Sequence, residues 1–197
     1  MPLGAGRYEC TYTLVEHQCG PLVKRGGAKL QMTIPGNTYT GGTHVVSGEM
    51  QFGASTFPEG TPVRLGDASG NAGTLNLPTG SHVISDLGGN GTVKSYTSLT
   101  VSNIVVDARR LVANTAALTC NGGVTLAEGA KVKLENAEYL ADAPNIRYDI
   151  LTMSSGSVSG AIAMDSYDEA VAGKWCVHNF GGKLQIVRVR GLTIVVQ

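Results

Sequence analysis

Charged residues are scarce in this chain. Asp, Glu, Lys and Arg make up only 15% of the 197 residues, and 15 basic residues balance 15 acidic ones, so the formal net charge is zero. The basic stripe that is typical of nucleic-acid binders is therefore missing, and we expect no nucleic-acid partner. The low charge also excludes a coiled coil, and the 42% hydrophobic content excludes a disordered chain.

Long apolar runs are absent too. No run reaches the about 18 apolar residues that a transmembrane helix needs, so the sequence predicts no transmembrane helix. The first ten residues, MPLGAGRYEC, lack the basic and apolar regions of a signal peptide. If the protein is exported, we expect this chain to be a fragment or to have lost its leader.

Motifs for metal binding and catalysis are also missing. No CxxC pair, GxSxG elbow or phosphate-binding loop occurs, so the sequence predicts no metal and no cofactor. Cys10 and Cys19 flank eight residues, TYTLVEHQ, which could form a hairpin closed by a disulfide. Cys120 and Cys176 are predicted to be small buried hydrophobes. Isolated positions at the surface or rim are predicted for the four histidines, His17, His44, His82 and His178.

Glycine and short alternating runs are what the chain has in abundance. The 27 glycines are about twice the usual share of roughly 7%. Apolar and polar residues alternate with period two in short segments such as AKLQMTI (Leu30, Met32), GTLNL (Leu75, Leu77) and AKVKLEN (Val132, Leu134). Clusters of Gly, Asn, Ser and Asp separate these segments. The pattern predicts an all-β protein of short strands.

Two architectures fit this rhythm. The spacing from the Leu75 strand to the Leu99 strand, and from there to the Leu118 strand, is about 20 residues, which suits one coil of a parallel β-helix. The Asn-Gly pairs at 90–91 and 121–122 are typical of hairpins and favour a β-sandwich. Composition and spacing leave both open.

A sequence motif distinguishes between them. Residues 20–55 contain a Gly pair, a Leu-x-Met strand, the stretch NTYTGGT and a Val-x-x-Gly-x-Met strand. This segment resembles the autotransporter-associated β-strand repeat. The residues that carry the most specific part of the resemblance are Asn37, Thr38, Tyr39, Thr40, Gly41, Gly42 and Thr43.

The resemblance implies a right-handed parallel β-helix from an exported bacterial passenger region. We expect an N-terminal cap over 1–19, coils over 20–138 with the repeat at 20–55, and an irregular insertion followed by C-terminal coils or a cap over 139–197. The implied function is a stalk in a secreted or cell-surface protein, with glycans or host and cell-surface proteins as adhesive partners. Neighbouring coils of a larger β-helical protein are further expected partners.

The motif residues suit the corners of such a coil. Asn37 could form an Asx-turn and join a ladder of side-chain hydrogen bonds, and Tyr39 offers an apolar body with a hydroxyl for the rim. Gly41 and Gly42 allow positive φ where the chain turns. The β-branched threonines fit a pleated surface. Inward-facing positions are expected for Val45, Met50 and Phe52.

The alternative function is a carbohydrate-active β-helix enzyme. Such an enzyme needs at least three acids and a basic residue in one groove, whereas the acids here are scattered singly except for DSYDE at 165–169, which we interpret as a solvated turn. Arg64, Arg109 and Arg110 are candidate bases or clamps. The candidate acids are Asp67, Asp86, Asp107, Asp142, Asp149, Asp165, Asp168 and Glu169. We expect a non-enzymatic protein.

Overall fold

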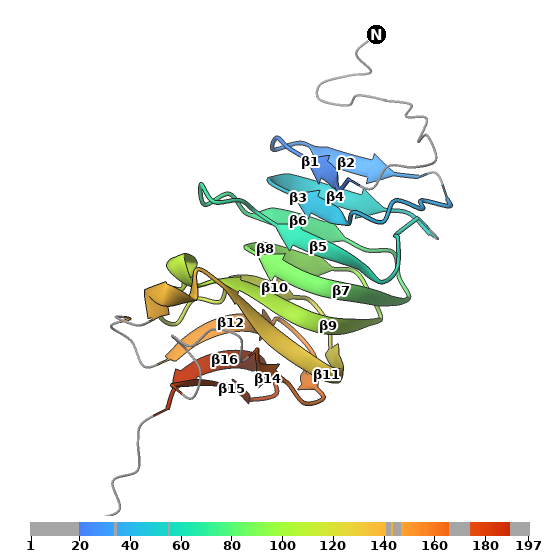
Figure 1. Ribbon diagram of the computed structural model, residues 1–197. Coiled ribbons are helices and arrows are strands. Elements are labelled where there is room, and N and C mark those ends of the chain that lie inside the picture. Colours follow the sequence, from blue (N-terminus) through green and yellow to red (C-terminus); the bar gives the residue numbers. More distant parts are fainter. Residues whose placement is uncertain are drawn as a thin grey trace, which may run out of the picture.

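Short strands dominate the computed structural model, which describes residues 20–33, 35–54, 56–140, 143, 147–165 and 174–189. They form two sheets (Figure 1). Sheet 1 contains β1 (Leu22–Lys24), β3 (Thr43–Val45), β5 (Thr61–Leu65), β7 (Ser81–Gly89), β9 (Ser98–Asp107), β11 (Val124–Glu135), β13 (Val158–Ser159) and β14 (Ala163–Met164). Sheet 2 contains β2 (Lys29–Met32), β4 (Gly48–Phe52), β6 (Gly73–Asn76), β8 (Gly91–Lys94), β10 (Leu118–Cys120), β12 (Arg147–Met153), β16 (Lys183–Arg188) and β15 (Trp175–Asn179). Two short 3-10 helices, η1 (Ala108–Arg110) and η2 (Ala137–Leu140), complete the described elements.

Consecutive strands alternate between the two sheets from β1 to β12. From β1 to β11, each strand pairs in parallel with the strand two positions further along the chain, so the strand pairs stack in chain order (Figure 1). We call a strand of sheet 1 together with the sheet 2 strand that follows it a rung. Among the described strands, antiparallel pairing occurs only between β12 and β16 and between β16 and β15. The predicted all-β class is confirmed, and this pairing does not match the antiparallel sheets of a β-sandwich.

In-register columns of apolar side chains form the core between the sheets. In sheet 2, one column joins successive rungs through parallel register and consists of Leu30, Met50, Leu75, Val93, Cys120 and Met153. Its four middle members are fully buried, as are Val45 and Leu65 in sheet 1. Burying a side chain of this size contributes about 1.5–3 kcal/mol. Because apolar and polar residues alternate, every second side chain along a strand points into this shared core. Val45, Met50 and Phe52 point inward as expected.

A second column, at the start of the sheet 2 strands, consists of glycines. Gly48 lies opposite Gly73, and Gly73 lies opposite Gly91. A Cβ built on Gly73 would collide with the carbonyl oxygen of Val45, and one on Gly91 with the carbonyl oxygen of Gly73. Main chains approach so closely here that no larger residue fits, which explains part of the high glycine content.

The two Asn-Gly pairs occupy corners between the sheets. Asn90 is the one residue between β7 and β8, and Asn121 and Gly122 follow β10 before β11. The hairpin interpretation was therefore wrong, because a sharp corner between two sheets requires the same residues: Gly89 beside Asn90 has a φ of 96°. The coil spacing was also assigned to the wrong strands. Leu75 on β6 lies opposite Val93, whereas Leu99 on β9 belongs to the other sheet.

The two ends of the chain differ in how far they are described. The predicted N-terminal cap at 1–19, with Cys10 and Cys19, lies outside the described residues. In the segment 139–197, β12 and β13 continue the parallel sheets before β15 and β16 add their antiparallel strands. Of the expected short helix or loop ENAEYLADAP, Ala137–Leu140 form a single 3-10 turn.

Candidate functional site

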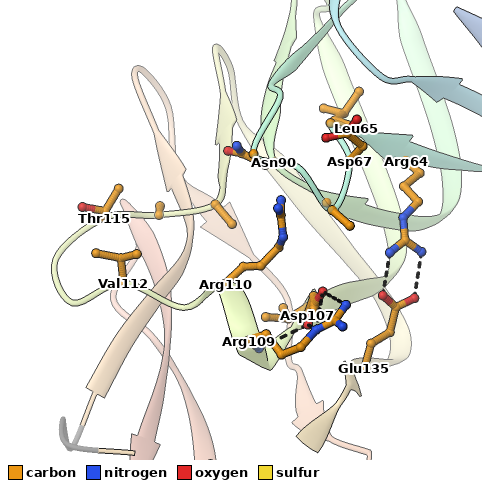
Figure 2. A pocket seen from close by; sticks show the side chains of 17 residues that line it. Arg64, Leu65, Asp67, Asn90, Asp107, Arg109, Arg110, Val112, Thr115 and Glu135 are labelled. Carbon is orange, nitrogen blue, oxygen red and sulfur yellow. Dashed lines mark hydrogen bonds and ion pairs between the residues drawn. The ribbon is translucent and has the colours of Figure 1, made fainter. Parts of the chain in front are cut away.

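A pocket lies at the carboxyl ends of four sheet 1 strands. Because β5, β7, β9 and β11 are parallel, their carboxyl ends meet at one edge of the sheet. Their connections to sheet 2 differ in length: β5 is followed by residues 66–72, β7 by Asn90 alone and β9 by residues 108–117. The short corner between two longer connections leaves a hollow of about 350 Å³ (Figure 2).

Two ion pairs hold the floor of this pocket. The guanidinium of Arg64 on β5 donates to both carboxylate oxygens of Glu135 on β11, at 2.8 and 2.6 Å. Arg109 donates to Asp107 from Nη2 at 2.7 Å and from Nε at 3.0 Å. The Arg109 side chain is the main cause of the lowered pKa of Asp107, and Asn136 adds a hydrogen bond of 2.9 Å. Asp107 is therefore an ionised carboxylate whose role is to orient η1.

Asp67 organises the loop on the other side of the pocket. Its carboxylate accepts hydrogen bonds from the Asn71 side chain at 2.9 Å, from the Ser69 amide at 2.9 Å and from the Asn71 amide at 3.2 Å. These hydrogen bonds, led by the Asn71 side chain, lower the pKa of Asp67. The result is an Asx-type turn that fixes the wall of the pocket with an ionised carboxylate on it.

Arg110 differs from its neighbours. Its side chain is half-buried and points into the pocket, between Asn90 and Asp67, away from the Asp107–Arg109 pair (Figure 2). In the part of the chain that the structure describes, no hydrogen bond or ion pair engages its guanidinium, and its interaction with Asp67 is only a longer-range electrostatic one. Arg110 thus presents up to five N–H donors to the pocket.

A second hollow, of about 480 Å³, lies on the outer face of sheet 1 and shares Arg64 and Glu135 with the pocket. Asp86 accepts hydrogen bonds there from Asn103 at 2.7 Å and from Lys133 at 3.1 Å. Arg64 pairs with Glu135, and the His44 ring lies 2.7 Å from the Gly66 carbonyl oxygen. All described ionisable groups that line this hollow are therefore engaged, unlike Arg110.

The repeat-motif residues connect rungs. Asn37 donates to the carbonyl oxygen of Thr56 at 2.5 Å, which joins the connections on either side of β3 and β4. Tyr39 is buried, and its hydroxyl hydrogen-bonds to Thr43 Oγ1 at 2.8 Å rather than reaching the rim. Burial raises the pKa of Tyr39 to about 12. Gly42 has a φ of 86°, and a Cβ there would collide with Pro62 of the next rung.

The other residues of the motif between Asn37 and Gly42 are Thr38, Thr40 and Gly41, beside Tyr39. Thr38 and Thr40 are exposed in the connection before β3, and Gly41 lies beside Gly42 at the start of that strand. The motif therefore shapes the corner that leads from β2 to β3, and none of its residues lines the pocket at the carboxyl ends.

The cysteines and histidines correct two expectations. Cys120 is fully buried as predicted, but Cys176 is only half-buried, and its Sγ lies 3.3 Å from Nε2 of His178. His82 is buried rather than at the rim: Nδ1 lies 2.6 Å from a carboxylate oxygen of Glu59, and Nε2 lies 2.8 Å from the Pro78 carbonyl oxygen. His82 thus ties two connecting segments together.

The remaining candidate acids are dispersed. Asp149 accepts hydrogen bonds from Lys183 and Gln185, and Asp165 forms an ion pair with Lys131 at 3.7 Å. Asp142, Asp168 and Glu169 lie outside the described residues. Across the described ranges, no three His, Cys, Asp or Glu side chains lie close enough to hold a metal ion, and no helix is long and apolar enough to cross a membrane.

Sequence reasoning named most of the pocket's charged residues without showing that they meet. The structure brings five of those candidates together: Arg64, Asp67, Asp107, Arg109 and Arg110. It adds Glu135, which sequence analysis missed, and Asn90, which sequence analysis interpreted only as part of a hairpin turn. Glu135 is the last residue of β11 and lies opposite Asp107, so the parallel register was the signal that would have found it. Comparison with protein-family models gives no match, and comparison with curated proteins gives no significant match.

Proposed function

We propose that this chain is a non-enzymatic β-helical module that serves as a rigid stalk or spacer in a bacterial exported or cell-surface protein. The observation that carries the proposal is the regular alternation of strands between two sheets, with parallel in-register pairing over six rungs. Each rung buries its apolar face against its neighbours, so stability increases with the number of rungs. Right-handed winding is part of the proposal, since parallel crossovers are right-handed in about 98% of cases.

The repeat motif supports the proposed family and location. NTYTGGT occupies the corner leading into β3, where Asn37 and Gly42 contact the neighbouring rung and the Tyr39 hydroxyl bonds locally to Thr43. These roles fit membership of the autotransporter-associated β-strand repeat family, whose repeats belong to exported passenger regions. The zero net charge and scarce charged residues suit a structural surface protein.

NMR on the isotope-labelled chain tests the architecture. Parallel in-register rungs place Met50 beside Leu75 and Leu75 beside Val93, so cross-strand nuclear Overhauser contacts should join these residues. Absence of these contacts would contradict the stacked rungs. Antibodies against this chain test the location: they should label intact source cells, and labelling only after permeabilisation would contradict surface exposure.

A carbohydrate-active enzyme is the second candidate, favoured by one observation. Three acids, Asp67, Asp107 and Glu135, converge with three arginines in one pocket, which is the combination that such an enzyme needs. Against it, the lowered pKa values of Asp67 and Asp107 remove them as general acids near neutral pH. A screen of acidic polysaccharides distinguishes the two functions. Turnover that Asp107→Asn abolishes would establish the enzyme, whereas absence of turnover would favour the stalk.

A further inference from the structure

We propose that the pocket at the carboxyl ends of β5, β7, β9 and β11 binds the carboxylate of a uronic-acid sugar through Arg110. This inference rests on the stacked rungs of the proposed function, because four of them supply the lining. It adds what a stalk alone lacks, a defined ligand site, and would make the module adhesive toward acidic glycans.

The charge pattern of the lining singles out Arg110. Arg64 is committed to Glu135 and Arg109 to Asp107, each through short hydrogen bonds. Arg110 has no such partner among the described residues, although it is half-buried and aimed at the open space (Figure 2). A guanidinium in this setting gains most from a planar anion that accepts two parallel hydrogen bonds, and a carboxylate has that geometry.

The rest of the lining favours a singly charged ligand with hydroxyl groups. Asp67 and Asp107 are ionised, so they repel a dianion such as phosphate more strongly than a monoanion. Asp67, Asn90 and Thr115 also line the pocket and offer oxygen or amide groups suited to sugar hydroxyls. Val112 and Ala116 add apolar surface for the C–H face of a ring.

The size of the hollow agrees with a sugar unit. At about 350 Å³ it lies near the lower end of the roughly 300–1,000 Å³ typical of small-molecule sites. Its walls come from connections of unequal length around Asn90, so one sugar ring of a longer acidic polysaccharide can enter while the remaining rings extend outside.

Titration of the ¹⁵N-labelled chain with glucuronate, followed by amide chemical shifts, tests the site. We expect saturable shifts at Asn90 and Thr115 and no comparable shifts with neutral glucose. Arg110→Gln should weaken binding by about tenfold or more, as expected for loss of a charge-assisted contact. Arg25→Gln, which changes an exposed arginine in the loop between β1 and β2, is the matched control and should leave binding unchanged.

Three outcomes would overturn the inference. These are equal binding by wild type and Arg110→Gln, equal shifts with glucose, and tighter binding of inorganic phosphate than of glucuronate at the same residues. Arg110→Lys keeps the charge but loses the planar fork, so it should bind more weakly than wild type while folding normally. If Arg110→Gln fails to fold, this variant decides. Arg110-dependent glucuronate binding by a protein that antibodies label only after the source cells are permeabilised would keep the site and overturn the surface stalk.

Discussion

Arg64 and Glu135 are joined by two hydrogen bonds, of 2.8 and 2.6 Å, across 71 residues of sequence. Between them on the outer face of sheet 1 lie Gly88 and Val105, in register with Arg64. Gly88 carries no side chain that would obstruct the arginine, and a Cβ there would press on Val105. One ion pair therefore spans four adjacent strands.

The Arg64–Glu135 pair should contribute little to stability despite its reach. The two side chains are 49% and 37% exposed, so a double-mutant cycle with Arg64→Gln and Glu135→Gln should give a coupling of about 0.5–1 kcal/mol in the free energy of unfolding. Urea titrations of the four proteins measure it, and 0.5 M salt should reduce it. A coupling above about 2 kcal/mol would show that the pair is shielded from solvent far better than its exposure indicates.

Gly73 should be among the least replaceable residues. Gly73→Ala places a methyl group against the Val45 carbonyl oxygen, where backbone must shift, so we expect a loss of about 2 kcal/mol or more in the free energy of unfolding. Gly27→Ala is the control, because open space surrounds that glycine. Similar thermal midpoints for the two variants would refute the close approach of main chains at the glycine column.

Glu49 should make stability depend on pH in the acid range. Its carboxylate accepts from Lys94 at 2.8 Å and Asn76 at 3.0 Å and lies 3.3 Å from Lys29, and these contacts, led by Lys94, lower its pKa to about 2. The lowered pKa stabilises the folded state above the unfolded value near 4.5. That contribution declines as pH falls toward 2.

Glu49→Gln tests this dependence. The side chain is 24% exposed, so solvent screening limits the expected loss at pH 7 to about 1 kcal/mol. The difference between wild type and variant should shrink as pH falls from 5 to 2. Glu128→Gln, at an exposed position, serves as the control. A difference that stays constant with pH would contradict an electrostatic origin.

The two described cysteines should differ in reactivity. Burial raises the pKa of the Cys120 thiol to about 12, whereas Cys176 is half-buried on β15 beside His178. At pH 8 iodoacetamide should label Cys176 in the native protein and reach Cys120 only after unfolding. Peptide mass mapping measures both sites, and rapid native labelling of Cys120 would contradict the packed sheet 2 column.

Period-two alternation was enough to predict strands and inward residues. Counting along single segments placed Leu75 and Val132 on alternating strands, and both side chains are buried, because a strand's own pattern sets which side is buried. Strand partners could not be counted in this way. The connections vary in length, so Leu75 appeared one coil from Leu99, although its partner is Val93.

The sequence predicted most of the charged residues of the pocket but not that they lie together. Arg109 and Asp107 are neighbours in sequence, and their pairing is local. Arg64 and Glu135 meet only because the parallel pairing of β5, β7, β9 and β11 brings the carboxyl ends of these strands to one edge of sheet 1. The Asn90-Gly91 pair correctly predicted a turn but not its type. Hairpins and corners between sheets require similar backbone freedom, so the pair alone does not distinguish them.

The single-residue corner at Asn90 lies between two much longer connections, residues 66–72 and 108–117. The register of β6, β8 and β10 nevertheless continues unbroken. The length of a corner is therefore independent of the strand pairing: a corner can accept an insertion without altering the hydrogen-bonding ladder beside it. For protein engineering, this makes residues 66–72 and 108–117 grafting sites for foreign peptides, and it gives evolution a way to change what the molecule recognises while its core stays the same.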